Sequence, residues 1–91
     1  MKATRIKVCG ITRACDAQAA AQAGVDAIGL MFYAKSSRAV SIEQAQDIVA
    51  ALPPFVTVVA VLVDEPIQSV ERILQKVGID VLQFHGGESL E

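Results

Sequence analysis

The sequence has little of several features that mark other classes of protein. Only two of its 91 residues are cysteines, Cys9 and Cys15, and tryptophan is absent. One such pair is no disulfide framework, and its spacing is not the C-x-x-C of many redox and zinc sites. The longest apolar run, residues 55–63, has the length of a strand and not of a membrane span. We see no signal peptide near the N-terminus, so we expect a cytoplasmic protein.

An excess of positive charge is also missing. The net charge is -2 at pH 7, and no basic patch is visible, which argues against a nucleic-acid partner. His85 is the sole histidine, so a cluster of imidazole metal ligands is excluded. What is present is 53% hydrophobic residues in a chain long enough for one small domain. This composition is typical of a folded α/β protein.

Short apolar runs alternate with helical patterns along the chain. We predict strands over residues 5–11, 27–33, 56–63 and 80–85, helices over about 14–23, 42–52 and 67–77, and the first turn of a fourth helix over 88–91. Such alternation requires a parallel sheet with right-handed crossovers. Two architectures fit, an open doubly wound sheet and part of a (β/α)8 barrel.

Several residues predict where the helices start. Thr12 can cap the first helix, and Ser41 with Gln44 three residues later has the pattern of a capping box. Pro66 suits the first turn of the third helix, because its missing N–H costs nothing there.

Two glycines predict where helices stop, and they belong to a faint internal repeat. Gly24 is expected in a left-handed conformation after the first helix, and Gly78 is expected to close the third. The segments that they open, GVDAI at 24–28 and GIDVL at 78–82, are similar. The alternative is that helix-to-strand connections simply look alike.

The length bears on the choice between the two architectures. No G-x-G-x-x-G follows the first strand, so a dinucleotide site is not supported. A full barrel needs at least about 200 residues, so a barrel would be represented here by roughly its first half. A half-barrel alone leaves two strand edges unpaired and one sheet face uncovered. We therefore expect the chain either to belong to a longer protein or to associate with itself.

The first strand ends in a candidate reactive corner. Side chains alternate across a strand, so Lys7 and Cys9 share one face and Val8 takes the other. A cation beside a thiol at the carboxyl end of a strand can support chemistry. The plain alternative is that Cys9 is a small buried hydrophobe. A redox thiol is a third alternative, against which the lack of a closely spaced resolving cysteine argues.

These residues belong to a wider resemblance. In chain order the matching segments are KVCGIT at 7–12, GVDAIG at 24–29 with FY at 32–33, KSSR at 35–38, PPFV at 53–56 and VLQFHG at 81–86. Together they resemble the phosphoribosylanthranilate isomerases of tryptophan biosynthesis. The departures are small: Ala34 and Ser37 stand where proline is common, and Asp64 stands where asparagine often does.

The resemblance implies a (β/α)8 TIM barrel of about twice this length, of which residues 1–91 would be the N-terminal half. It implies an Amadori rearrangement of N-(5-phosphoribosyl)anthranilate to 1-(o-carboxyphenylamino)-1-deoxyribulose 5-phosphate, without cofactor or metal. The reaction needs an acid that opens the ribose ring and a base that takes the proton from C2 of the sugar.

Site residues follow from the resemblance position by position. Cys9 matches the general base, and a cation such as Lys7 can lower a thiol pKa; an interior lysine with another partner is an equal alternative. Arg38 matches the arginine for the anthranilate carboxylate, a role that suits a planar fork, although a solvated loop arginine is the commoner case. Alternation places Gln83 and His85 on one face near the end of the fourth strand, and we expect them near the substrate or supporting the residues that contact it. Interior polar groups satisfied by other partners are an equal alternative for both. Cys15 is expected to be inert.

In the family, the general acid is an aspartate in the second half of the barrel, and the phosphate site comes from the last loops. We interpret Asp64 as a helix cap and not as a replacement acid. The 91 residues alone are therefore expected to lack isomerase activity. The competing hypothesis is a non-catalytic half-barrel module that self-associates and binds anthranilate-like acids.

Overall fold

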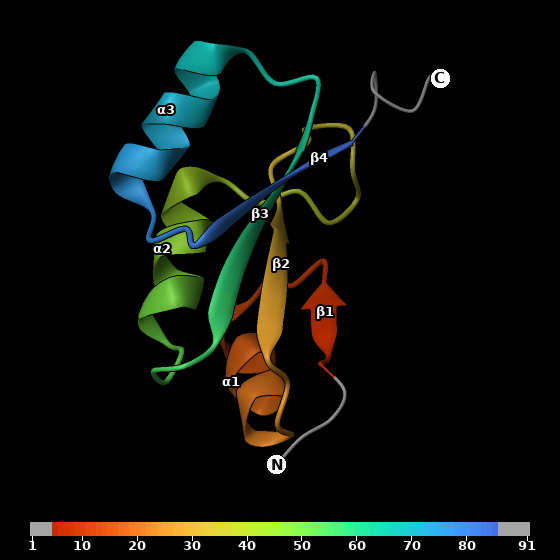
Figure 1. The fold of residues 1–91 in the computed structure, drawn as a ribbon, viewed down its shortest axis with the longest axis vertical. Coiled ribbons are helices and arrows are strands. Elements are labelled where there is room, and N and C mark those ends of the chain that lie inside the picture. The colour runs from red at the N-terminus through yellow and green to blue at the C-terminus, as the bar shows by residue number, and fades with distance from the viewer. Residues whose placement is uncertain (1–4, 86–91) are drawn as a thin grey trace.

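The computed structural model describes residues 5–85, which form a parallel sheet with helices on one side (Figure 1). The strands are β1 (Lys7–Cys9), β2 (Ala27–Met31), β3 (Thr57–Val63) and β4 (Val81–His85), in the spatial order β1-β2-β3-β4. The helices are α1 (Ala14–Gln22), α2 (Ile42–Ala50) and α3 (Ile67–Lys76), each connecting two consecutive strands. The predicted alternation is confirmed. The helical turn predicted at 88–91 lies outside the described residues.

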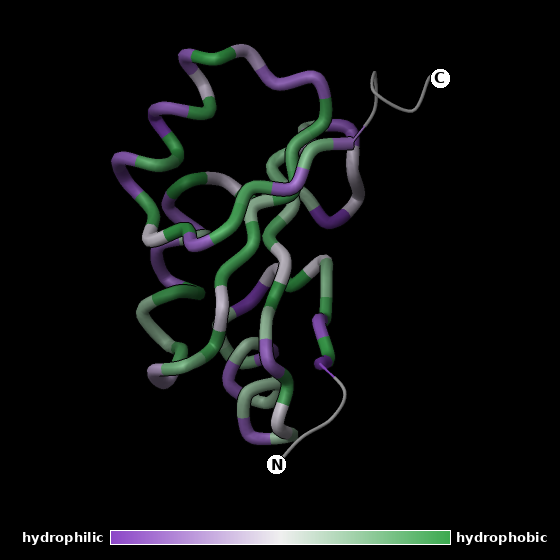
Figure 2. Tube along the Cα trace, viewed as in Figure 1, coloured by the Kyte–Doolittle hydropathy of each residue, from purple (hydrophilic) through white to green (hydrophobic). Residues whose placement is uncertain are grey.

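The hydrophobic core lies between the sheet and the helices. Its fully buried large side chains are Ile28, Leu30, Ile48 and Leu62. Ala17 of α1 and Ala45 of α2 are completely buried, and such small side chains let helices approach the sheet closely. Each helix supplies one apolar face, and Figure 2 shows hydrophobic and hydrophilic residues alternating along α3. No helix within residues 5–85 is long and apolar enough to cross a membrane.

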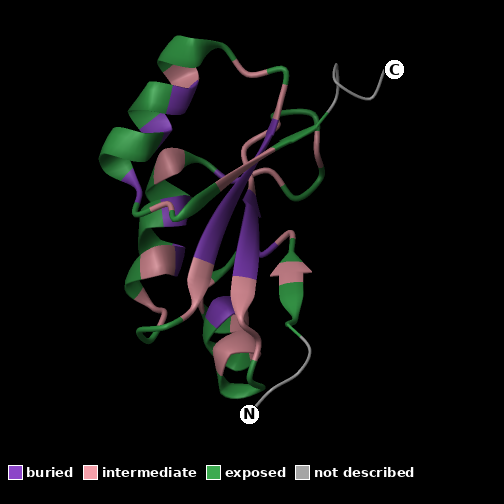
Figure 3. Ribbon diagram, viewed as in Figure 1, coloured by how far each residue is buried: buried purple, intermediate pink, exposed green. Residues whose placement is uncertain are grey.

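Burial is highest at the centre of the sheet and falls at its edges (Figure 3). Five consecutive residues of β3 are buried, whereas β4 has none. Phe84 is 55% exposed, although its partner in the register, Leu62, is completely buried. Both side chains project to the helix side. Leu82 of β4 packs there against the core cluster that includes α3 residues, so it is only the end of β4 at Phe84 that lacks a cover within the described residues.

The ends of α1 and α2 test the predicted caps. The capping box is confirmed, because Gln44 N–H donates to Ser41 Oγ at 3.0 Å and Ser41 N–H donates to Gln44 Oε1 at 2.9 Å. Gly24 follows α1 with φ 92°, as predicted. The prediction for Thr12 is wrong: the cap residue of α1 is Arg13, and its side chain makes no capping bond.

The ends of α3 correct three predictions. Pro66 is the cap residue in an extended conformation and not part of the first turn. The cap residue of α3 is therefore not Asp64, which lies two residues before Pro66, just after β3, with φ 50°. Val77 already turns the chain to extended backbone with φ -124°, so α3 ends without a left-handed residue and Gly78 is not its stop.

The internal repeat has a structural counterpart in its two aspartates. Asp26 Oδ2 accepts the N–H of Ile6 at 2.7 Å, just before β1. Asp80 Oδ2 accepts the N–H of Val58 at 2.8 Å, near the start of β3. Each carboxylate therefore fixes the amino end of the strand beside its own.

Candidate active site

The side of the sheet away from the helices carries the polar residues predicted for the site. We call this side the open face. It is formed by Lys7, Cys9, Ala27, Gly29, Met31, Thr57, Val59, Val61, Val63, Val81, Gln83 and His85, which alternate in the register with the core residues. The prediction for β1 is confirmed: Lys7 and Cys9 are exposed on this face, and Val8 packs against the core.

A chain of polar contacts crosses the open face. Lys7 Nζ donates to Gln83 Oε1, and Gln83 Nε2 lies 2.6 Å from His85 Nε2. Three strand spacings, about 14 Å in a flat sheet, separate β1 from β4. The contact therefore requires the sheet to curl toward the open face, as strands do when they close into a barrel. Gln83 is thus the partner of Lys7, as in the alternative of an interior lysine that pairs with a residue other than Cys9.

The loop after β2 brings Arg38 to the carboxyl end of β1. Val40 N–H donates to the Met31 carbonyl at 2.8 Å, and Arg38 N–H donates to Ser36 Oγ at 3.1 Å, so the loop folds back on the end of β2. A Cβ added to Gly10 would lie 2.5 Å from Arg38 Cδ. The arginine side chain thus lies directly over the residue that follows Cys9.

The structure therefore assembles two neighbouring groups from the predicted residues. Arg38 lies against Gly10, the residue that follows Cys9 at the end of β1, and Lys7 links to Gln83 and His85 across the curl of the sheet. The carboxyl ends of the strands are where barrel enzymes carry their sites.

The other chemical side chains lie elsewhere. Cys15 is exposed on α1. Arg13 pairs with Asp16 in the first turn of α1, with Nε 2.9 Å from Oδ2; this hydrogen bond and the carboxylate charge raise the pKa of Arg13. Within residues 5–85, no group of three histidine, cysteine or acidic side chains could hold a metal ion.

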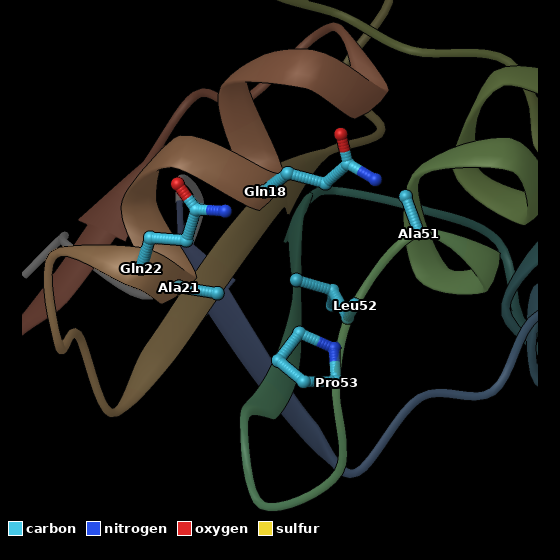
Figure 4. Close-up of a pocket in the computed structure, with 6 residues that line it drawn as sticks. All are labelled: Gln18, Ala21, Gln22, Ala51, Leu52 and Pro53. Atoms are coloured by element: carbon cyan, nitrogen blue, oxygen red, sulfur yellow. The ribbon is translucent and has the colours of Figure 1, made fainter.

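An open pocket of about 430 Å³ lies away from these residues (Figure 4). It is lined by Gln18, Ala21, Gln22, Ala51, Leu52 and Pro53. These residues come from the end of α1 and the connection after α2, which lead into the amino ends of β2 and β3. The pocket is therefore at the opposite end of the sheet from Cys9.

Sequence reasoning missed two glycines in the site, Gly10 and Gly29. Gly29 lies in the middle of β2, where a glycine weakens a strand and marks a close approach of backbone. That signal was available from the sequence once the strand had been predicted.

Comparison with known proteins decides the family. The model of the family described as N-(5'phosphoribosyl)anthranilate (PRA) isomerase matches residues 6–91. The chain belongs to this family. The isomerase of Pseudomonas paraeruginosa is 59% identical over 91 residues, which is 100% of this chain and 43% of the relative. That of Neisseria meningitidis serogroup B is 57% identical over 88 residues, covering 97% and 42%.

Solved PRA isomerases share the fold. The crystal structure from Thermotoga maritima superposes with a TM-score of 0.89 at 40% identity, over 96% of this chain and 42% of that one. A second structure, of a PRA isomerase in complex with reduced 1-(o-carboxyphenylamino)-1-deoxyribulose 5-phosphate, matches with the same TM-score and identity. This chain spans less than half the length of these relatives. The predicted fold class, parallel β/α units of the first half of a (β/α)8 barrel, is confirmed.

Proposed function

We propose that this chain supplies the amino-terminal half of a PRA isomerase active site. The reaction is the Amadori rearrangement of N-(5-phosphoribosyl)anthranilate to 1-(o-carboxyphenylamino)-1-deoxyribulose 5-phosphate. Membership of the family supports it, as does a relative that binds a reduced form of this product. The substrate is thus a small molecule that carries a carboxylate and a phosphate.

The observation that carries the proposal is the contact of Arg38 with Gly10, the residue that follows Cys9 in the chain. In the substrate, the anthranilate carboxylate is ortho to the nitrogen that bears the sugar, so only a few bonds separate it from C2. A base for the C2 proton and an anchor for the carboxylate must therefore be neighbours. Cys9, as thiolate, takes the proton, and the guanidinium of Arg38 holds the carboxylate by paired hydrogen bonds.

The polar chain on the open face lies beside this pair. Lys7 donates to Gln83, and the Gln83 amide lies against the His85 ring. We assign Gln83 and His85 to contacts with the sugar hydroxyls, with Lys7 holding the amide in place. The general acid that opens the ribose ring and the phosphate site come from the second half of the barrel.

The uncovered edges of the sheet support the need for that second half. Phe84 is 55% exposed on the helix side of β4, and Val81 is 46% exposed on the open face. A neighbouring strand with its covering helix would bury Phe84, and closure of the sheet into a barrel would cover Val81. A second copy of this chain is the alternative cover, which corresponds to the non-catalytic self-associating module. Sedimentation of the 91-residue chain with and without a separately produced carboxyl-terminal half of a relative separates these cases.

The activity test uses two proteins. One is the 91-residue chain alone; the other is this chain joined, after residue 91, to the part of the P. paraeruginosa isomerase that it does not match. Conversion of phosphoribosylanthranilate is followed by the change in anthranilate fluorescence. We expect no conversion by the chain alone and conversion by the joined isomerase.

Variants of the joined isomerase test the named roles. Cys9→Ala is expected to lower kcat by about 10²–10⁴-fold, the usual contribution of a general base, and Cys15→Ala serves as the matched control. Arg38→Lys keeps the charge but loses the planar fork, so KM should rise more than kcat falls. Full activity of the Cys9→Ala variant would refute the proposed mechanism.

A further inference from the structure

The open face has a gap in its side chains at Gly29, in the centre of β2. Glycine in a strand interior costs stability, because it adds chain entropy and packs nothing. Its neighbours on the same face of β2, Ala27 and Met31, carry side chains. Gly29 is buried and pairs directly with Cys9 in the register.

The Cys9 side chain fills this gap. A Cβ built on Gly29 would lie 2.7 Å from Cys9 Sγ and 3.2 Å from Cys9 Cα. The first distance is shorter than real carbon contacts allow, so any larger residue would displace the thiol. The second distance shows that the backbones of β1 and β2 also approach closely at this point.

Gly10 likewise leaves space for a neighbouring side chain, that of Arg38. Its φ of 85° lies in the left-handed region, and an added Cβ would lie 2.5 Å from Arg38 Cδ and 3.0 Å from Arg38 Nη1. Gly10 N–H donates to the Gly29 carbonyl at 3.0 Å. This hydrogen bond joins the two glycines. Neither has a side chain, and the spaces that their side chains would take are occupied by Cys9 at Gly29 and by Arg38 at Gly10.

We propose that Gly29 and Gly10 are positioning residues of the isomerase site: Gly29 fixes the place of the Cys9 thiol, and Gly10 fixes the place of the Arg38 guanidinium. The proposal rests on the roles given above to Cys9 and Arg38. It assigns each glycine to a different kinetic constant, because the thiol acts in the chemical step and the guanidinium in binding.

Gly29→Ala in the joined isomerase tests the first assignment. A small displacement of the base should lower kcat by about tenfold to a hundredfold and change KM little. The alkylation rate of Cys9 by iodoacetamide should change several-fold, whereas that of Cys15, on α1, should not. The matched control is Gly78→Ala, since a Cβ there meets only Val49 Cγ1 at 3.7 Å.

A double-mutant cycle covers the case in which Gly29→Ala impairs folding. If the space belongs to the thiol, the loss of stability from Gly29→Ala should be smaller when Cys9 is already alanine. Equal losses in both backgrounds, or an unchanged Cys9 alkylation rate, would overturn the proposal for Gly29. Alkylation and unfolding are measured without activity, so they test the role of Gly29 separately from the role of Cys9. Inactivation by Cys9→Ala with no effect of Gly29→Ala on alkylation would refute only the Gly29 assignment. Full activity of Cys9→Ala would refute the proposed function instead.

Gly10 is tested by Gly10→Ala and Gly10→Asn. Asparagine tolerates the left-handed backbone, so it separates the effect of bulk near Arg38 from backbone strain. Both variants should raise KM more than they lower kcat. An unchanged KM in the asparagine variant would overturn the assignment of Gly10.

Discussion

The two faces of the sheet are built for different purposes from the same strands. On the helix side, Leu30 and Leu62 are completely buried, while the open face exposes Lys7, Cys9 and His85. The period of two in a strand makes this separation available to every segment. Even β1, three residues long, gives Val8 to the core and its two other side chains to the open face. Val59 and Val61 at the centre of the open face are also buried, so the separation holds for its polar residues. At those polar positions, substitutions should affect chemistry more than stability.

The sharpest test of the core side compares Leu62 with Phe84, which pair in the register and project to the same side. Leu62→Ala removes a completely buried side chain and should cost about 2–5 kcal/mol of unfolding free energy. Phe84→Ala should cost much less in the 91-residue chain, because the ring is 55% exposed. Urea unfolding followed by circular dichroism measures both. Equal losses would mean that β4 is covered in solution, by a second copy of the chain.

The aspartates of the internal repeat come next in expected size. Asp80→Ala removes a charge-assisted hydrogen bond to Val58 N–H and should cost about 1.5–3 kcal/mol. Asp26→Ala should cost less, since its bond to Ile6 N–H is exposed to water. Asp80→Asn, which keeps an acceptor, is the control and should recover part of the loss. A larger loss at Asp26 would show that the edge strand depends more on this contact than the centre does.

Removing the cap of α2, on the helix side of the sheet, should lower the free energy of unfolding by a smaller amount. Ser41→Ala removes the acceptor for Gln44 N–H and should cost about 1 kcal/mol. Ser41→Gly should cost only a few tenths of that, because glycine solvates the helix end better than alanine does. Neither variant should change the alkylation rate of Cys9. A change there would show that α2 controls the open face as well as the core.

The sequence predicted those features that depend on neighbouring residues. The capping box spans three residues, and each strand was an apolar run that could be seen locally. Strand ends were less predictable: β1 was expected over 5–11 but is limited to Lys7–Cys9, because Gly10 turns into the left-handed region. The predicted end of α3 was also misplaced, because Val77 already adopts an extended backbone before Gly78 is reached.

The candidate site was predictable only as a set of residues and not as an arrangement. The resemblance to the family named Cys9 and Arg38, and alternation placed Gln83 and His85 on one face. The contact of Lys7 with Gln83 joins residues 76 apart and depends on the curl of the whole sheet, which no local pattern encodes. The gap at Gly29 has meaning only once the Cys9 side chain is known to fill it.

The smallest expected effect on stability is that of Lys7, and it tests the open face directly. Lys7→Met keeps most of the apolar stem but loses the bond to Gln83, which is exposed to water. We expect a loss of less than about 1 kcal/mol in urea unfolding, because water replaces the lost partner. Lys35→Met, in the exposed loop after β2, is the matched control. In the joined isomerase, Lys7→Met should still raise KM, since it frees the Gln83 amide to rotate. A loss of stability as large as that of Leu62→Ala would mean that the polar chain helps hold the sheet in its curl, and that the two faces are not separate.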